Sequence, residues 1–79
     1  MYPLILDKDI SAEIGAQIRY ARTKAGMTRA DLAESLSIRQ SAVGNWEAGI
    51  RVPRIQTLYR IAYSLNCSIY DLMPEEDPR

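Results

Sequence analysis

Two short amphipathic segments separated by only three residues restrict the fold of this chain more than any other feature. The first segment covers residues 29–36 and the second about 40–48, with residues 37–39 between them. Apolar residues recur in both at the three- to four-residue spacing of a helix. Two helices joined by so short a connection pack at a steep angle, and the second then projects from the body. Because generic helix pairs share these features, the pair alone does not establish a function.

The remaining sequence predicts three further helices and no strand of any length. A first helix is expected to follow a cap at Asp9 or Ser11, to run to about Lys24 and to be ended by Gly26. Its inward stripe would consist of Ile10, Ile14, Ile18, Ala21 and Ala25. A fourth helix is expected over about 55–65, and a last short one over 69–73. The predicted fold class is therefore all-α, a compact arrangement of five helices.

The length of 79 residues allows one domain. We expect an N-terminal arm at 1–8, a domain at 9–74 and a mobile acidic tail at 75–79. No segment has the roughly 20 apolar residues needed to span a bilayer, so no membrane association is expected. The chain has one cysteine, Cys67, and no histidine, which argues against an internal disulfide and against Cys/His zinc sites. We expect no metal, no cofactor and a reducing cytoplasmic setting.

Charge is unevenly distributed although the formal net charge is zero. The stretch 19–60 has eight basic residues and three acidic ones, and the flanks have two basic and seven acidic ones. A basic centre is what neutralisation of DNA phosphates requires, whereas the total charge gives no such indication. An ordinary solvated helical surface is the alternative explanation.

Sequence landmarks in every expected helix make the interpretation more specific. They are IR-x-x-R, G-M-T, D-L-A-E-S-L, V-x-N-W-E-x-G-x-R-x-P, T-L-x-x-I-A and C-S-x-x-D-L-M, spread over 14–73. This run closely resembles the phage-repressor and Cro-like helix-turn-helix family, also called XRE-like. The resemblance implies a lambda-repressor-like five-helix fold and binding of a double-stranded operator by a dimer. It also implies that the third helix, 40–48, is the recognition helix in the major groove.

One face of the expected recognition helix is polar. Val43 and Trp46 are predicted to face inward, and Trp46 is interpreted as core rather than as an intercalating wedge. The opposite face presents the candidate base-contacting residues Gln40, Ser41, Gly44 and Asn45. Gln and Asn side chains can bond bidentately to an adenine edge, and Ser can bond to several bases. Gly44 has no side chain, so it either permits close approach to a thymine methyl group or has no role in binding.

Four arginines are candidate DNA-backbone contacts, with plain solvent exposure as the alternative: Arg29, Arg39, Arg51 and Arg54. By resemblance, Arg22 and Glu47 instead form a structural ion pair between the first helix and the end of the recognition helix. Ser37 departs from the family, which favours glycine at a turn position that often has positive φ. Such a conformation costs a residue other than glycine about 1–2 kcal/mol.

The end of the domain has more apolar surface than a short terminal helix can bury by itself. The candidate dimer surface consists of Tyr63, Ile69, Tyr70, Leu72 and Met73, which would alternatively close the core. A homodimer would place two recognition helices about 34 Å apart on an inverted-repeat operator.

These residues bear on three candidate functions. The first is a small transcriptional regulator, in particular a repressor, of a bacterium or phage. The second is the antitoxin of a toxin–antitoxin pair, which would bind both a toxin protein and its own operator. The third, an enzyme, lacks support because the chain has no histidine, no paired carboxylates, no phosphate-binding glycine loop and no nucleophile beyond Cys67. Cys67 is interpreted as buried filler between the last two helices.

Overall fold

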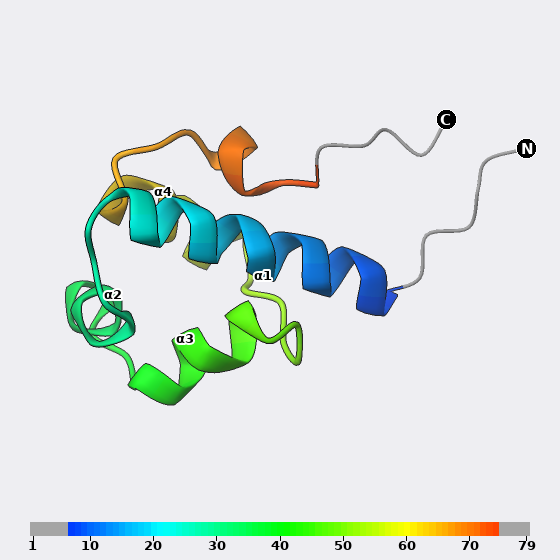
Figure 1. The fold of residues 1–79 in the computed structure, drawn as a ribbon, viewed down its shortest axis with the longest axis horizontal. Helices are drawn as coiled ribbons and strands as arrows, with labels where there is room; N and C mark the ends of the chain where they lie inside the picture. The colour runs from blue at the N-terminus through cyan, green and yellow to red at the C-terminus, as the bar shows by residue number, and fades with distance from the viewer. Residues whose placement is uncertain (1–6, 75–79) are drawn as a thin grey trace, which may run out of the picture.

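The computed structural model describes residues 7–74, so most of the expected arm and the whole expected tail lie outside the described residues. The described part has four α-helices and one short 3-10 turn, η1, and it has no strand. The elements are α1 (Asp7–Lys24), α2 (Arg29–Leu36), α3 (Gln40–Glu47), α4 (Ile55–Ser64) and η1 (Ile69–Leu72). In Figure 1, α1 crosses the middle of the molecule, with α2 and α3 on one side and η1 on the other.

The expectation of five helices is wrong at the last element. Only five residues separate the cap Ser68 from Pro74, which leaves no room for a regular α-helix. The segment forms tighter bonds instead, from the amide of Asp71 to the carbonyl of Ser68 and from Met73 to Tyr70. The first helix also begins at Asp7, before either of its expected caps, Asp9 and Ser11.

Helix ends follow the local signals in the sequence. Thr28 and Asp31 form a capping box, in which the Asp31 amide donates to Thr28 Oγ1 at 3.0 Å and the Thr28 amide donates to Asp31 Oδ2 at 2.9 Å. Ser68 and Asp71 form a second capping box before η1. Gly26 follows α1 with a φ of 76°, a conformation that suits a glycine after a helix.

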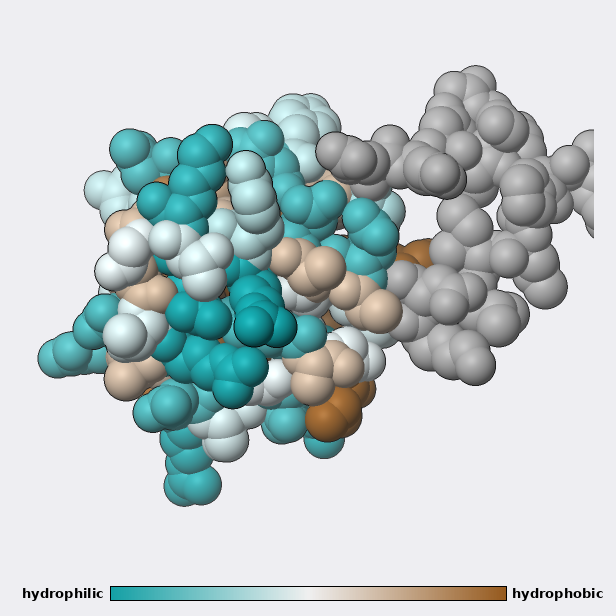
Figure 2. Space-filling model, in the orientation of Figure 1, coloured by the Kyte–Doolittle hydropathy of each residue, from teal (hydrophilic) through white to brown (hydrophobic). Residues whose placement is uncertain are grey.

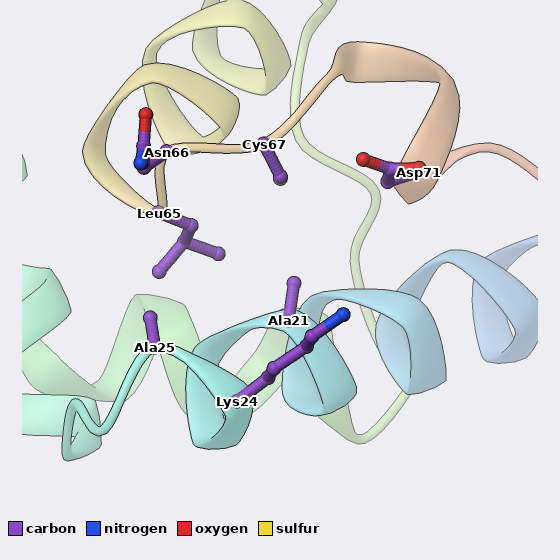
Figure 3. Close-up of a pocket in the computed structure, with 7 residues that line it drawn as sticks. All are labelled: Ala21, Lys24, Ala25, Leu65, Asn66, Cys67 and Asp71. Atoms are coloured by element: carbon purple, nitrogen blue, oxygen red, sulfur yellow. The ribbon is translucent and has the colours of Figure 1, made fainter.

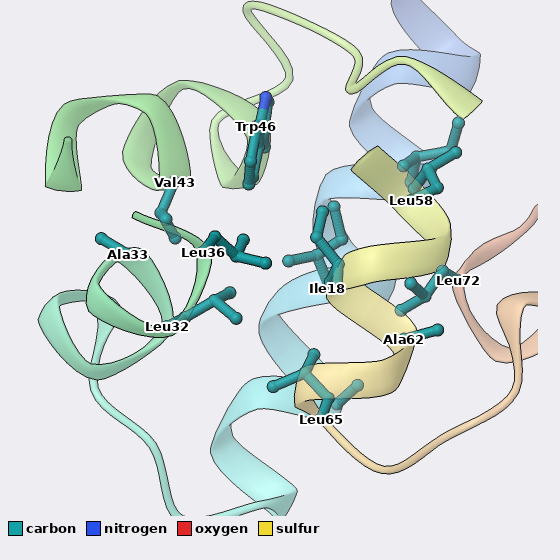
Figure 4. Close-up of a cluster of buried hydrophobic side chains, with 13 residues drawn as sticks. Ile18, Leu32, Ala33, Leu36, Val43, Trp46, Leu58, Ala62, Leu65 and Leu72 are labelled. Atoms are coloured by element: carbon teal, nitrogen blue, oxygen red, sulfur yellow. The ribbon is translucent and has the colours of Figure 1, made fainter. Parts of the chain in front are cut away.

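The core is a single cluster of apolar side chains contributed by every element. Ile18, which is fully buried, lies between Leu32 and Leu36 of α2 and Leu58 of α4 (Figure 4). Ala25 is exposed, contrary to the expected inward stripe of the first helix, because α1 ends at Lys24. The face over α1 in Figure 2 is mostly hydrophilic with scattered apolar side chains, so the apolar stripe of this helix points into the molecule.

Two glycines bring α1 and the end of α3 unusually close together. A Cβ atom on Gly15 would collide with the carbonyl oxygen of Trp46 and would lie 3.0 Å from that of Glu47. A Cβ atom on Gly49 would lie 3.1 Å from Cα of Ala12. The backbone of α1 therefore supports the C-terminal end of α3 directly, and this contact fixes how far α3 projects.

Candidate nucleic-acid interface

The side chains of α3 separate into a buried face and a solvent face. Val43 and Trp46 are buried, as the sequence pattern predicts. On the solvent side, Gln40 and Ser41 are exposed and Gly44 and Asn45 are half-buried. The four candidate base-contacting residues therefore share one accessible side of a helix that lies at the edge of the fold (Figure 1).

The loop after α3 is fastened to the helix that precedes it. The carbonyl oxygen of Asn45 accepts hydrogen bonds from the amides of Ile50 at 2.9 Å and Arg51 at 3.3 Å. Pro53 is buried, while Arg51 and Arg54 on either side of it are exposed. The two arginines therefore lie on an anchored loop beside α3.

Glu47 is the acidic centre of a small charged network at the end of α3. Its Oε2 atom lies 2.6 Å from Nε of Arg22, and its Oε1 atom accepts a second bond from Arg22 Nη2 at 3.2 Å. Arg22 also donates from Nη1 to the carbonyl oxygen of Met27 at 2.7 Å. Only 10% of the Arg22 side chain and 1% of the Glu47 side chain are exposed. This buried pair therefore joins three parts of the fold, namely α1, α3 and the turn that precedes α2.

Arg29 is a second partner of Glu47, a pairing that no sequence pattern predicts. Its Nε atom donates to Glu47 Oε1 at 3.0 Å, and 45% of its side chain remains exposed. Arg39, which precedes α3, is also exposed and makes no side-chain cap to the helix. Arg29 and Arg39, two of the candidate contacts to the DNA backbone, therefore reach solvent at opposite ends of α3.

The network keeps Glu47 ionised despite its burial. Burial acts to raise the pKa of the carboxyl group, but the hydrogen bonds and positive charges of Arg22 and Arg29 outweigh it and hold the pKa below its ordinary value. Glu47 is the only acidic residue between 39 and 60, and two arginines neutralise it. The exposed charges between 39 and 60 are therefore basic.

The turn between α2 and α3 is held from outside by α4. Ser37 has a φ of 58°, the left-handed conformation expected where the family favours glycine. The carbonyl oxygen of Leu36 accepts a bond from Nη2 of Arg60 at 2.9 Å, and Ser35 Oγ donates to Ser64 Oγ at 3.2 Å. Local sequence patterns do not predict this role of Arg60, because the contact joins residues 24 positions apart.

The expected dimer surface divides into two parts. Tyr63 and Tyr70 are 88% and 83% exposed, and Ile69 and Met73 are half-buried against the core. Leu72 is completely buried and belongs to the core, so its assignment to the dimer surface is wrong. The tight turn of η1 directs this side chain inward between α1 and α4, against which η1 packs.

A surface pocket lies between the last turn of α1 and the connection from α4 to η1 (Figure 3). Lys24 and Asp71 line it together with Cys67, which is half-buried. Burial raises the pKa of the Cys67 thiol, and the negative charge of Asp71 raises it further. The thiol is therefore protonated at neutral pH and poorly suited to act as a nucleophile.

Within residues 7–74, no helix combines the length and apolar character needed to cross a membrane. The same part of the chain brings no three His, Cys, Asp or Glu side chains together as potential metal ligands.

Comparisons with known proteins agree with this geometry. Residues 18–72 match the helix-turn-helix family model HTH_3. An uncharacterized HTH-type transcriptional regulator of Archaeoglobus fulgidus is 34% identical over 61 residues, which cover 77% of this chain and 87% of that protein.

Two solved structures have the same fold over nearly their whole length. The restriction-modification controller protein C.AhdI from Aeromonas hydrophila is 25% identical with a TM-score of 0.75, and the match covers 80% of this chain and 96% of that one. The DNA-binding domain of BldD is 26% identical with a TM-score of 0.75, and the match covers 85% and 97%. The chain belongs to the HTH_3 helix-turn-helix family, a family of DNA-binding transcriptional regulators rather than of enzymes.

Proposed function

We propose that this regulator binds an inverted-repeat operator as a homodimer and represses transcription, with α3 of each copy in the major groove. The observation that carries the proposal is the solvent face of α3, where Gln40, Ser41 and Asn45 are accessible and no acidic side chain is exposed. Amide side chains in such a position form bidentate hydrogen bonds with adenine edges.

Basic residues surround this polar face on the same side of the fold. Arg39 precedes α3, Arg51 and Arg54 follow it on the anchored loop, and Arg29 flanks it from α2. In the proposed complex Arg39, Arg51 and Arg54 bind phosphates and set the register of the helix on the duplex. The buried, doubly paired Glu47 adds no exposed negative charge that would oppose them.

Two copies are needed because one short helix reads only a few base pairs. Tyr63 and Tyr70 are the exposed aromatic side chains of the proposed dimer surface, and Ile69 and Met73 lie at its edge. A two-fold axis there would present recognition helices about 34 Å apart, one turn of DNA. A dimer across an operator occupies DNA that a polymerase would need, which makes repression the direct consequence.

Selection of bound duplexes from a library with a randomised window tests the proposal. We expect an enriched inverted repeat, and we expect Gln40→Ala and Asn45→Ala each to lose preference at one position per half-site. Each lost pair corresponds to about 1–3 kcal/mol of discrimination. A folded wild-type chain that enriches no sequence would contradict sequence-specific binding. An enriched single half-site bound by a monomer would contradict the dimer.

A further inference from the structure

The middle of the recognition face has a gap where Gly44 lacks a side chain. One turn before it lies Gln40, and Asn45 follows it directly. A Cβ atom on Gly44 would have Nη1 of Arg29 as a neighbour at 3.9 Å. The guanidinium of a residue on α2 therefore lies beside the position on α3 that has no side chain of its own.

Arg29 is held in this place by one edge of its guanidinium. Nε is bonded to Oε1 of Glu47 at 3.0 Å, and Glu47 is itself fixed from the other side by Arg22. Among the residues that the structure describes, none accepts a hydrogen bond from Nη1 or Nη2 of Arg29. Two parallel N–H donors thus remain on a side chain that is 45% exposed.

We propose that Arg29 is a specificity-determining residue that reads a guanine in the major groove, in the place left open by Gly44. Guanine presents O6 and N7 as adjacent acceptors there, and an arginine fork bonds to both at once. Glu47 is the positioning residue, because it fixes the guanidinium without using the two outer donors. The inference rests on the proposed function, since it requires α3 to enter the groove.

A phosphate contact is the competing role for the Arg29 side chain. The two roles have different effects on sequence preference and affinity. A base contact changes which sequences are bound, whereas a phosphate contact changes affinity for all sequences alike. The location of Nη1 beside the central residue of α3 favours the base contact.

The test is duplex selection from a randomised library with the wild-type chain, Arg29→Ala and Arg29→Lys. We expect the wild-type motif to contain one guanine per half-site whose enrichment disappears in Arg29→Ala, while the positions that depend on Gln40 and Asn45 stay enriched. Replacing that guanine in a fixed operator should weaken wild-type binding roughly 5- to 100-fold and Arg29→Ala binding hardly at all. Arg29→Lys keeps the charge but loses the planar fork and the Nε bond to Glu47, so it should weaken the guanine preference.

Lys24→Ala is the matched control, because it removes one exposed basic residue of α1 that lines the pocket with Cys67 and Asp71, on the η1 side of α1. It should leave the selected motif unchanged. Gly44→Gln is a second variant, which fills the gap while keeping both partners of the Arg29–Glu47 pair, and it should weaken the guanine preference. Thermal unfolding checks that each variant is folded.

An unchanged motif in Arg29→Ala, with uniformly weaker binding and a shallower salt dependence, would overturn the inference and assign Arg29 to a phosphate. A wild-type chain that enriches no sequence would instead overturn the proposed function on which the inference rests. The two failures are therefore distinguishable in one experiment.

Discussion

Arg22 and Glu47 are joined by two hydrogen bonds, of 2.6 Å and 3.2 Å, across 25 positions of sequence. The pair connects the last turn of α1 with the last turn of α3, and the carboxylate is almost completely buried. Removing one partner of a buried pair costs more than an exposed pair contributes, because it leaves a charge without compensation.

Arg22→Met should therefore destabilise the domain by about 3 kcal/mol, near the lower end for a buried pair because Arg29 still compensates Glu47. Arg29→Met is the matched control on the same carboxylate, and since Arg29 is 45% exposed it should cost at most about 1 kcal/mol. Urea unfolding measures both free energies. Equal losses in the two variants would show that burial does not govern the contribution of these arginines.

Gly15 is a position where any side chain should be harmful. A Cβ atom there meets the backbone carbonyl of Trp46, which cannot move without shifting α3. Gly15→Ala should cost about 1–3 kcal/mol, the usual range for overpacking. Gly44→Ala introduces the same methyl group where the nearest atom, Nη1 of Arg29, would be at an ordinary contact distance of 3.9 Å, and it should stabilise α3 by up to about 1 kcal/mol. Thermal unfolding compares the two, and a Gly15→Ala protein as stable as the wild type would contradict the close contact between α1 and α3.

Ser37 has a conformation that glycine adopts more readily. Its φ of 58° lies in the left-handed region, and the residue is exposed. Ser37→Gly should raise the free energy of unfolding by about 1 kcal/mol, after allowance for the greater flexibility of glycine in the unfolded chain. Asn66, with a φ of 55°, is the control. Since asparagine tolerates this region, Asn66→Gly should gain less. A loss of stability in Ser37→Gly, measured by urea unfolding, would be evidence against strain in the turn.

Arg51 should contribute to affinity without contributing to sequence preference. It is exposed on the loop that is hydrogen-bonded to Asn45, where it would reach a phosphate of a bound duplex. Arg51→Ala should weaken binding to all duplexes and reduce the slope of log affinity against log salt concentration by about 0.9, the value for one phosphate. Titrations of labelled duplexes at several salt concentrations measure the slope. A changed sequence preference with an unchanged slope would assign Arg51 to a base instead.

Local signals in the sequence predict most of the fold. The capping box at Thr28, the left-handed turn at Ser37 and the inward face of α3 all depend on residues within a few positions of one another. The end of the chain is harder to predict, because a four-residue turn has no periodicity from which the burial of Leu72 follows.

The candidate site is predictable where the family pattern reaches and not beyond it. The polar face of α3 follows from helical spacing, and the Arg22–Glu47 pair follows from the resemblance. The bond from Arg29 to the same carboxylate depends on how α2 crosses α3, which no local pattern encodes. An isolated glycine inside a helical pattern does indicate close packing, and Gly15 carries that signal.

Glu47 should make the stability of the domain sensitive to acid. Its pKa in the folded protein is held below the ordinary value of 4.5, because Arg22 and Arg29 outweigh the effect of burial. A carboxyl group with a lowered pKa stabilises the fold fully above its unfolded pKa, and this contribution is lost as the pH falls through the folded pKa. We therefore expect the free energy of unfolding to fall below about pH 4.5.

Glu47→Gln separates this effect from general acid denaturation. The variant should be less stable than the wild type at pH 7, and the difference should shrink as the pH decreases below 4.5, because the wild-type side chain becomes neutral as well. Asp31 also has a lowered pKa, because it is hydrogen-bonded to Thr28. Asp31→Asn therefore serves for comparison, since it removes a carboxylate that is exposed. Urea unfolding from pH 7 to pH 3 gives the curves. A constant difference between wild type and Glu47→Gln over that range would show that the charge of Glu47 is not what stabilises the junction of α1 and α3.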